Sequence, residues 1–390
     1  MEFKGINDKS IFLIFLLKSL RVFLFGYMSI ILPNYLLIVG FNSFYAGLII
    51  TVSIIFSSLM NIFTAKYGGD KNIYKILISF SIFIILSGLF LFSYNKYLII
   101  LGSIIGMIST TGTETGPFLS IEQALIPKFV KSEFSTFYYS IYNILGYLFS
   151  VFGDFSVYLV NINYIRYYFL FYSIMGFIFV IVYTIIKDHL YYKSNIKSAV
   201  KNDTKKIAFI TGILFSIDSF AGGFILQSIL ALWLKHFFDV NVSNQGLILG
   251  TGGIITVISL YITPYIARRY GLLNTMVFSH LISNVFLILI VFVNSLFYVI
   301  LLLYLRQAFS QMDVPTRQSF FMKIIDENDR TYFTSFTNMP RGFAQAGSPW
   351  LAGLIISLNV LYLPFLIAGT LKISYDLIIY KIFANYKDIK

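Results

Sequence analysis

The sequence predicts an all-α polytopic membrane protein with twelve transmembrane helices, arranged as two pseudo-symmetric halves of six. Charged residues make up only 12% of the 390, and hydrophobic residues make up 58%, which leaves too little charge to cover a soluble protein. The apolar runs, such as 76–92 and 281–293, are continuous rather than alternating, which favours spanning helices over a β-barrel. This composition excludes a soluble enzyme, a disordered chain and a disulfide scaffold.

Twelve apolar stretches are each long enough to cross a bilayer, which takes roughly 20 residues of helix. They cover residues 11–39, 43–65, 73–94, 97–126, 133–157, 165–187, 206–235, 243–267, 272–294, 296–322, 331–358 and 360–384. The first stretch is too long for the apolar region of a signal peptide and has no small-residue cleavage site. We therefore expect no signal peptide.

Lysine and arginine are concentrated in alternate loops. The basic loops lie near residues 4–9, 66–75, 128–131, 187–206, 268–269, 323–330 and 387–390. The opposite side of the membrane has little more than Lys96, Arg166 and Lys235. Basic loops stay on the cytoplasmic side, so we expect both termini in the cytoplasm and the protein in the plasma membrane. The net charge of +12 then reflects topology rather than nucleic-acid binding.

One sizeable polar segment divides the chain into halves of similar length. Residues 187–206 contain six lysines. The predicted parts are an N-terminal six-helix bundle at 1–187, a basic cytoplasmic linker at 188–205 and a C-terminal six-helix bundle at 206–390. For the linker, contact with anionic lipid headgroups is favoured over binding of a partner protein.

A short motif recurs in the two halves at an offset of 203 residues. The loop after the second stretch reads Asn-Ile-Phe-Thr-Ala-Lys-Tyr-Gly over 61–68. The loop after the eighth stretch reads Pro-Tyr-Ile-Ala-Arg-Arg-Tyr-Gly over 264–271. Parallel repeats of six spans are an architecture of secondary transporters, so the repeat supports the division into two halves.

These loops resemble the motif Gly-x-x-x-Asp-Arg-x-Gly-x-Arg/Lys-Arg/Lys of the major facilitator superfamily. The matching residues are Lys66, Gly68 and Lys71 in the first copy and Arg269 and Gly271 in the second. Ala65 replaces the Asp of the motif, and Asp70 lies close enough in sequence to substitute for it. The resemblance implies that these residues form a cytoplasmic gate.

Two later segments look like a signature of prokaryotic efflux-type members of the superfamily. They are Gln-Met-Asp-Val-Pro-Thr-Arg-Gln at 311–318 and Asn-Met-Pro-Arg-Gly-Phe-Ala-Gln-Ala-Gly-Ser-Pro at 338–349. Arg317 and Arg341 lie in these segments and are assigned to the gate or its scaffold, with Arg341 expected to pair with Asp313 or Glu122. The resemblance further implies that spans 1, 4, 7 and 10 line a central cavity.

Three carboxylates in the apolar stretches are candidates for carrying a proton, because charges inside a membrane are costly and usually face the bundle interior or a wet cavity. Glu114 lies in the polar run 110–117, where small residues and a proline predict an irregular helix. Its alternative role is an ion pair with an arginine. Asp218 is the single acid of its stretch. Asp313 precedes Arg317 by four residues, so the two can also pair on one helix face.

Four residues are candidates for binding a substrate. Arg21 and Arg306 lie at depth in the first and tenth stretches. The expected role of Arg21 is to bind or neutralise an anionic group, and that of Arg306 is to bind an anion or to bias the pKa of a carboxylate. Gln227 follows Asp218 by nine residues. Tyr142 belongs to a helical stripe of tyrosines, for which core packing is the alternative.

Other charged residues have local interpretations. Lys18 is expected to extend its side chain to the cytoplasmic headgroups. Glu122 is expected to be structural, with a basic partner near the end of its helix. Lys372 and Asp376 are four residues apart and are expected to form a local pair on one helix.

The expected function is secondary active transport by alternating access, with proton-coupled export of a small organic or amphiphilic compound as the leading hypothesis. The alternatives are a facilitator or importer of an anionic metabolite, a lipid flippase and a non-transporting receptor. The sequence has no Walker-type loop, no nucleophile–base arrangement and no cysteine, so we expect no enzyme, no metal and no cofactor. The expected partners are the solute, protons or another coupling ion, and membrane lipids, with no nucleic acid and a monomeric chain.

Overall fold

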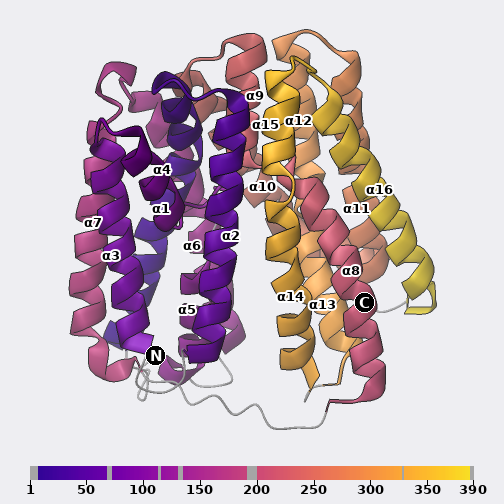
Figure 1. Ribbon diagram of the computed structural model, residues 1–390. Coiled ribbons are helices and arrows are strands. Elements are labelled where there is room, and N and C mark those ends of the chain that lie inside the picture. The colour runs from indigo at the N-terminus through magenta and orange to yellow at the C-terminus, as the bar shows by residue number, and fades with distance from the viewer. Residues whose placement is uncertain are drawn as a thin grey trace. The chain divides into compact units, whose positions relative to one another are not determined.

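The computed structural model describes residues 8–67, 73–112, 116–130, 135–190, 200–326 and 329–386. All regular secondary structure in these ranges is helical (Figure 1). The α-helices are α1 (Asp8–Ile38), α2 (Ser43–Tyr67), α3 (Ile73–Phe92), α4 (Lys96–Ile105), α5 (Pro117–Phe129), α6 (Ser135–Ser156), α7 (Tyr167–Ile185), α8 (Asn202–Gly223), α9 (Gln227–Phe238), α10 (Val242–Tyr270), α11 (Leu272–Leu289), α12 (Leu296–Ser310), α13 (Asp313–Ile324), α14 (Arg330–Ala346), α15 (Pro349–Ser357) and α16 (Leu363–Phe383). The predicted all-α class is confirmed.

Each of the twelve predicted stretches overlaps at least one of these helices. The fourth, seventh, tenth and eleventh stretches contain two each, namely α4 and α5, α8 and α9, α12 and α13, and α14 and α15. Among the described residues, eight helical segments are long and apolar enough to cross a membrane. The chain is therefore a multi-pass membrane protein built from helices.

The breaks within these stretches have local causes. The irregular fourth span was predicted, and it is confirmed, because α4 ends at Ile105 and α5 begins with Pro117 as its first residue. Proline suits that position since it lacks the N–H that has no partner in the first turn. The breaks after Gly223, Ser310 and Ala346 were not predicted. Non-helical backbone at membrane depth is tolerated only inside protein or beside a cavity.

The chain divides into two compact units. Unit 1 comprises Met1–Asn42, Ile49–Ile196 and Val240–Leu247, and unit 2 comprises Ser43–Leu48, Lys197–Asp239 and Ile248–Lys390. In unit 1, α1 packs against α5, α6 and α7, and α3 packs against α4 and α7. In unit 2, α8 packs against α14 and α16, and α11 packs against α12, α13 and α16. The boundaries predicted for two bundles and a linker stay a prediction.

Small residues allow α3 and α7 to approach closely in unit 1. Gly88 of α3 lies directly against Phe169 and Ser173 of α7, so a methyl group at Gly88 would overlap their backbone atoms. Ser173 Oγ also donates to the carbonyl oxygen of Ile85 at 2.7 Å. Contacts of this kind are typical of membrane helices, because apolar helices gain no hydrophobic energy from leaving lipid for one another.

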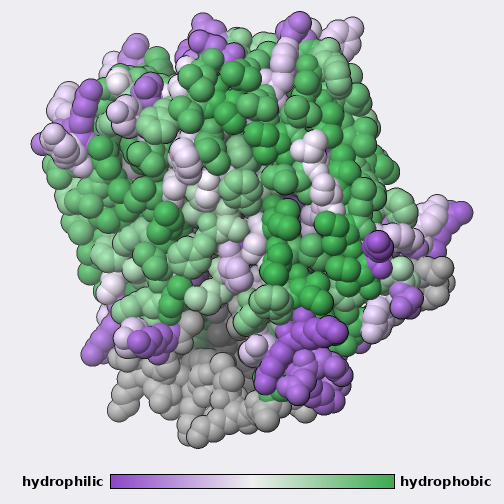
Figure 2. Space-filling model, turned by 45° about the vertical axis from the view of Figure 1, so that its right-hand side comes forward, coloured by the Kyte–Doolittle hydropathy of each residue, from purple (hydrophilic) through white to green (hydrophobic). Residues whose placement is uncertain are grey.

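Large apolar side chains cover much of the outer surface. Along α7, for example, Phe171, Ile174, Phe177 and Ile181 follow one another at helical spacing, and all are exposed. Figure 2 shows apolar residues over the middle of one face and hydrophilic residues toward its two ends. An apolar surface of this extent suits a lipid environment and would be a liability in water.

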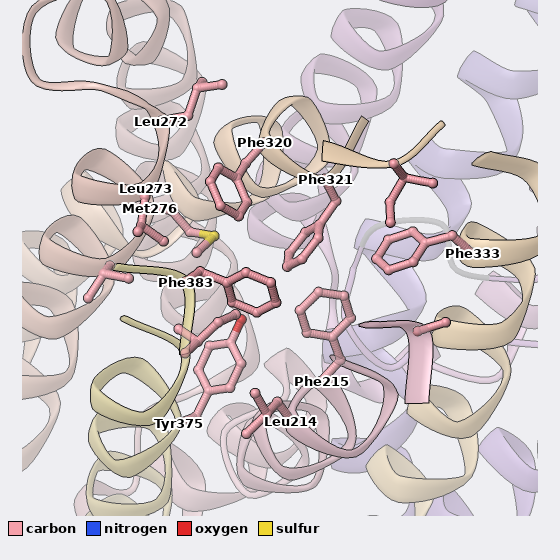
Figure 3. Close-up of a cluster of buried hydrophobic side chains, with 14 of the residues drawn as sticks. Leu214, Phe215, Leu272, Leu273, Met276, Phe320, Phe321, Phe333, Tyr375 and Phe383 are labelled. Carbon is pink, nitrogen blue, oxygen red and sulfur yellow. The ribbon is translucent and has the colours of Figure 1, made fainter. Parts of the chain in front are cut away.

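Aromatic side chains fill the core of unit 2. Figure 3 shows Phe215, Phe321, Tyr375 and Phe383 pointing toward one another from α8, α13 and α16. The Phe321 and Phe383 ring centroids are 5.3 Å apart in an edge-to-face arrangement, which is the favoured geometry for such pairs. Asp376 directly follows Tyr375 in the chain, so this core continues into the polar cluster that forms the candidate site.

Candidate functional site

A buried carboxylate in unit 2, Asp218 of α8, contacts basic groups from three other helices. Lys372 Nζ of α16 donates to Asp218 Oδ1 at 2.6 Å. Arg317 Nη1 of α13 lies 3.6 Å from Oδ2, and His280 Nε2 of α11 lies 3.8 Å from Oδ1. None of these four side chains is more than 9% exposed. Asp218 therefore joins α8 to α11, α13 and α16 electrostatically.

The cluster extends to two further carboxylates. Arg317 Nη1 lies 3.0 Å from Asp313 Oδ2, so the predicted i,i+4 pair forms. His280 Nδ1 lies 2.7 Å from Asp376 Oδ1, and Asn284 Nδ2 donates to Asp376 Oδ2 at 3.0 Å. We define the Asp218 network as Asp218, His280, Asp313, Arg317, Lys372 and Asp376.

The expected local pair between Lys372 and Asp376 is wrong. Lys372 bonds to Asp218 instead, and Asp376 bonds to His280 and Asn284. An i,i+4 pair on one helix is worth only about 0.2–0.5 kcal/mol. Buried charges need several well-placed partners to offset their desolvation, and the neighbouring helices α8 and α11 supply them.

Arg306 and Arg341, which lie within helices of unit 2, have no ion pair with any described residue. Arg306 of α12 is 9% exposed, and its Nε has no hydrogen-bond partner. Arg341 of α14 donates from Nε to Ser219 Oγ at 3.2 Å and from Nη1 to Asn338 Oδ1 at 3.3 Å. The expected Arg341–Asp313 pair is therefore wrong, because a hydroxyl and an amide take the place of the carboxylate.

An aromatic ring connects Arg341 to the Asp218 network. The Phe215 ring centroid lies 5.0 Å from the Arg317 guanidinium carbon and 5.6 Å from that of Arg341. A ring face attracts a cation at these distances, and the attraction is stronger where water is excluded. Phe215 thus belongs both to the aromatic core and to the charged cluster.

Unit 1 contains a separate buried ion pair. Arg21 of α1 donates from Nη1 to Glu122 Oε1 at 2.9 Å and from Nη2 to Glu122 Oε2 at 2.6 Å. Tyr183 donates to Oε1 and Tyr142 to Oε2, each at 2.8 Å. The Arg21 and Glu122 side chains are fully buried. Both carboxylate oxygens therefore have two donors, which is the arrangement that offsets the cost of burying an ion pair.

This geometry bears on two of the predicted substrate-binding residues. Arg21 also stacks on Phe118, with its guanidinium carbon 4.5 Å from the ring centroid. Tyr142 is fully buried, and its ring lies 4.6 Å from Lys18 Nζ. The contacts of both residues are those of packed interior groups. Their role in binding a substrate stays a prediction.

The remaining predicted residues lie apart from these clusters or outside the described ranges. Gln227 is the first residue of α9 and is half-buried. Lys66 and Arg269 are exposed at the ends of α2 and α10. Gly271 has φ +85° between α10 and α11. Glu114, Gly68, Asp70 and Lys71 lie outside the described residues.

Several members of the two clusters were missed from the sequence. His280 was not identified from the sequence, although its i,i+4 spacing to Asn284 places two polar groups on one face of a mostly apolar helix. Tyr183 gave no signal, since a single tyrosine in an apolar stretch is ordinary. In the part of the chain that the structure describes, no group of three His, Asp or Glu side chains is placed to hold a metal ion.

The architecture of this chain is similar to that of known transporter structures. No family model matches the sequence. An uncharacterized membrane protein of Saccharomyces cerevisiae is 24% identical over 412 aligned positions, covering 92% of this chain and 91% of the yeast protein. A crystal structure of the peptide transporter POT in complex with sulfate matches 99% of this chain and 96% of its own, with a TM-score of 0.77 and 12% identity. The nucleoside transporter NupG matches 98% and 100%, with a TM-score of 0.70 and 14% identity. The chain therefore has the fold of the major facilitator superfamily, as the resemblance of its loops predicts.

Proposed function

We propose that this protein is a secondary active transporter that works by alternating access and couples solute movement to protons. The observation that carries the proposal is the Asp218 network. Three carboxylates and three basic groups from four helices meet there with almost no exposure. A buried network of this kind is expensive to keep, and in membrane proteins such groups are usually functional.

The network provides a way for a proton to change helix packing. A proton on Asp218 removes the negative charge that Lys372 and Arg317 face. A proton on Asp376 does the same for His280. In either case the electrostatic contacts that join α8 to α11, α13 and α16 weaken together, because buried networks are cooperative. Protonation thereby acts on a packed set of helices, as a local charge switch does in other two-state proteins.

The proposed substrate is a small organic compound. An apolar pocket of about 510 Å³ between α8 and α14 suits an apolar or amphiphilic portion; Phe209, Ile213 and Phe336 are among the residues that line it. The segments at 311–318 and 338–349, which resemble efflux-type proteins, favour export. The second candidate function is movement of an anionic metabolite, which is favoured by the buried Arg306 without an ion pair among the described residues.

We further propose that the protein is a monomer in the plasma membrane with both termini in the cytoplasm. This proposal rests on the one-sided distribution of basic loops in the sequence. Membrane lipids and the coupling ion would then be its other partners.

The proposed function is tested by solute accumulation in proteoliposomes under an imposed pH gradient. The solutes are labelled nucleosides, dipeptides, organic anions and amphiphilic cations. Wild-type protein should accumulate or expel at least one class in response to the gradient, and Asp218→Asn should abolish the response. Asp239→Asn is the matched control, because Asp239 is an exposed aspartate at the end of α9 that pairs only locally with Lys235. Identical responses of wild type and Asp218→Asn, or no response of wild type to any class, would refute the proposal.

A further inference from the structure

The charges of the Asp218 network, taken together with Arg306 and Arg341 of the same unit, do not balance. The carboxylates are Asp218, Asp313 and Asp376, whereas the permanent cations are Arg306, Arg317, Arg341 and Lys372. With His280 neutral, the cations exceed the carboxylates by one, and with His280 protonated the excess is larger. An uncompensated charge is costly at this depth, so the interior of unit 2 favours the arrival of an anion.

The structure shows which cation carries the excess. Lys372 is 2.6 Å from Asp218, and Arg317 is 3.0 Å from Asp313. Arg341 has hydrogen bonds to Ser219 and Asn338 that disperse part of its charge. Arg306 alone in this set has neither an ion pair nor a hydrogen bond to any described side chain, although it is 9% exposed. Its electrostatic partner is Asp218, which acts on it without contact.

We infer that Arg306 binds the negatively charged group of the transported solute, and that the substrate is a small organic anion. A guanidinium presents a planar set of donors that matches a carboxylate or phosphate in two-point geometry. The inference rests on the proposed function, because a bound anion is a substrate only if the protein is a transporter. Binding itself can be measured without transport.

The same charge distribution links the anion to the coupling proton. Adding a proton to a carboxylate of the Asp218 network increases the positive excess, so it strengthens the attraction of an anion to Arg306. By reciprocity, the anion then favours proton uptake by the same free energy. The groups that take part in this linkage are Asp218, His280, Arg306, Asp313, Arg317, Arg341, Lys372, Tyr375 and Asp376. Acidification should therefore tighten anion binding. Proton and anion then cross the membrane together, so the inference deepens the second candidate function, movement of an anionic metabolite, rather than export.

The test compares acids with their uncharged amides in thermal unfolding of the purified full-length protein. The probes are acetate, benzoate and succinate, inorganic phosphate, and acetamide, benzamide and succinamide, at constant ionic strength and at two pH values. At least one anion should raise the unfolding temperature of wild type, more so at the lower pH, while its amide does not. Arg306→Gln should weaken that apparent affinity by about tenfold or more, and Arg306→Lys should retain part of it.

Two controls keep the outcome decisive. Lys235→Gln removes an exposed cation at the end of α9, where Lys235 pairs with Asp239, and should leave the shift unchanged. Nanodiscs of phosphatidylcholine, with and without phosphatidylglycerol, separate a soluble anion from a lipid headgroup. The inference is overturned if no anion stabilises wild type, if the amides act equally, if Arg306→Gln responds as wild type does, or if only phosphatidylglycerol stabilises the protein through Arg306. The thermal-unfolding test applies no pH gradient, so anion binding can be detected even if the transport assay of the proposed function fails.

Discussion

Asp218 of α8 accepts a hydrogen bond of 2.6 Å from Lys372 of α16, across 154 positions of sequence. The contact is buried, and it takes Lys372 away from Asp376, the acid one helical turn further along its own helix. Helix α16 thereby presents a cation to α8 and a carboxylate to α11. Helices α8 and α16, which pack against each other, are thereby joined by opposite charges.

The Arg21–Glu122 pair should be a strong determinant of stability. Either Arg21→Gln or Glu122→Gln leaves the remaining charge buried without its partner, which costs about 3–5 kcal/mol. We expect each variant to lower the free energy of unfolding by that amount, measured by denaturant titration in mixed micelles. The double variant should lose less than the sum of the two single variants, because it leaves no lone charge. As a control, Lys235→Ala breaks an exposed i,i+4 pair and should cost at most about 0.5 kcal/mol. Additive losses from the two single variants would contradict this account.

Arg306 should behave in the opposite way to the paired arginines. Replacing a buried cation with Gln removes a charge whose desolvation no ion pair with a described residue offsets. We therefore expect Arg306→Gln to leave the unfolding temperature of the ligand-free protein unchanged or to raise it. Arg317→Gln, by comparison, leaves Asp313 without its ion-pair partner and should clearly lower the unfolding temperature. Equal destabilisation by the two substitutions would mean that Arg306 has a structural partner after all.

Close packing of α3 on α7 should make Gly88 intolerant of any side chain. A Cβ at Gly88 would overlap the backbone of Phe169 and Ser173, and overpacking of this kind costs about 1–3 kcal/mol. Gly212 of α8 is the matched control, since a Cβ there meets only the Phe336 ring, at 3.8 Å. Gly212→Ala should be neutral or stabilising by up to about 1 kcal/mol, because alanine is more stable than glycine in the interior of a helix. The difference between the two variants in thermal unfolding tests the packing.

The turn between α10 and α11 should depend on glycine. Gly271 has φ +85° and ψ 160°, a region that is essentially restricted to glycine. Gly271→Ala is expected to cost about 1–3 kcal/mol of stability, whereas Arg268→Ala, an exposed neighbour, should change it by about 0.5 kcal/mol or less. A Gly271→Ala variant as stable as wild type would show that the turn relaxes freely.

Much of the fold could be predicted from the sequence because the apolar stretches are long and the basic loops alternate. Residues 167–185, for instance, contain no charge, and nothing but a spanning helix suits such a run. The interruption before Pro117 was also visible, since proline and small residues cluster there. The breaks after Ser310 and Ala346 were not, because the residues there are compatible with a continuous helix and only tertiary packing decides against it.

The candidate site was harder to predict than the fold. Asp218 was identified from its isolation in an apolar stretch, and the Asp313–Arg317 pair from its spacing. Lys372 was misassigned, because one sequence reveals neighbours on the same helix but not those on an adjacent one. His280 was missed for the same reason, since its partners lie 62 positions before it and 96 positions after it. Contacts between distant helices are set by packing that local sequence patterns do not encode.

Solute-driven proton movement in sealed vesicles shows directly whether the Asp218 network couples protons to transport. Protein is reconstituted with a pH-sensitive dye inside the vesicles, and a transported solute is added with no imposed pH gradient. If the network couples protons to the solute, wild type and Asp239→Asn change the internal pH as the solute moves, and Asp218→Asn moves no protons. Proton movement by Asp218→Asn at the wild-type ratio to solute would contradict the claim that the Asp218 network couples protons to transport.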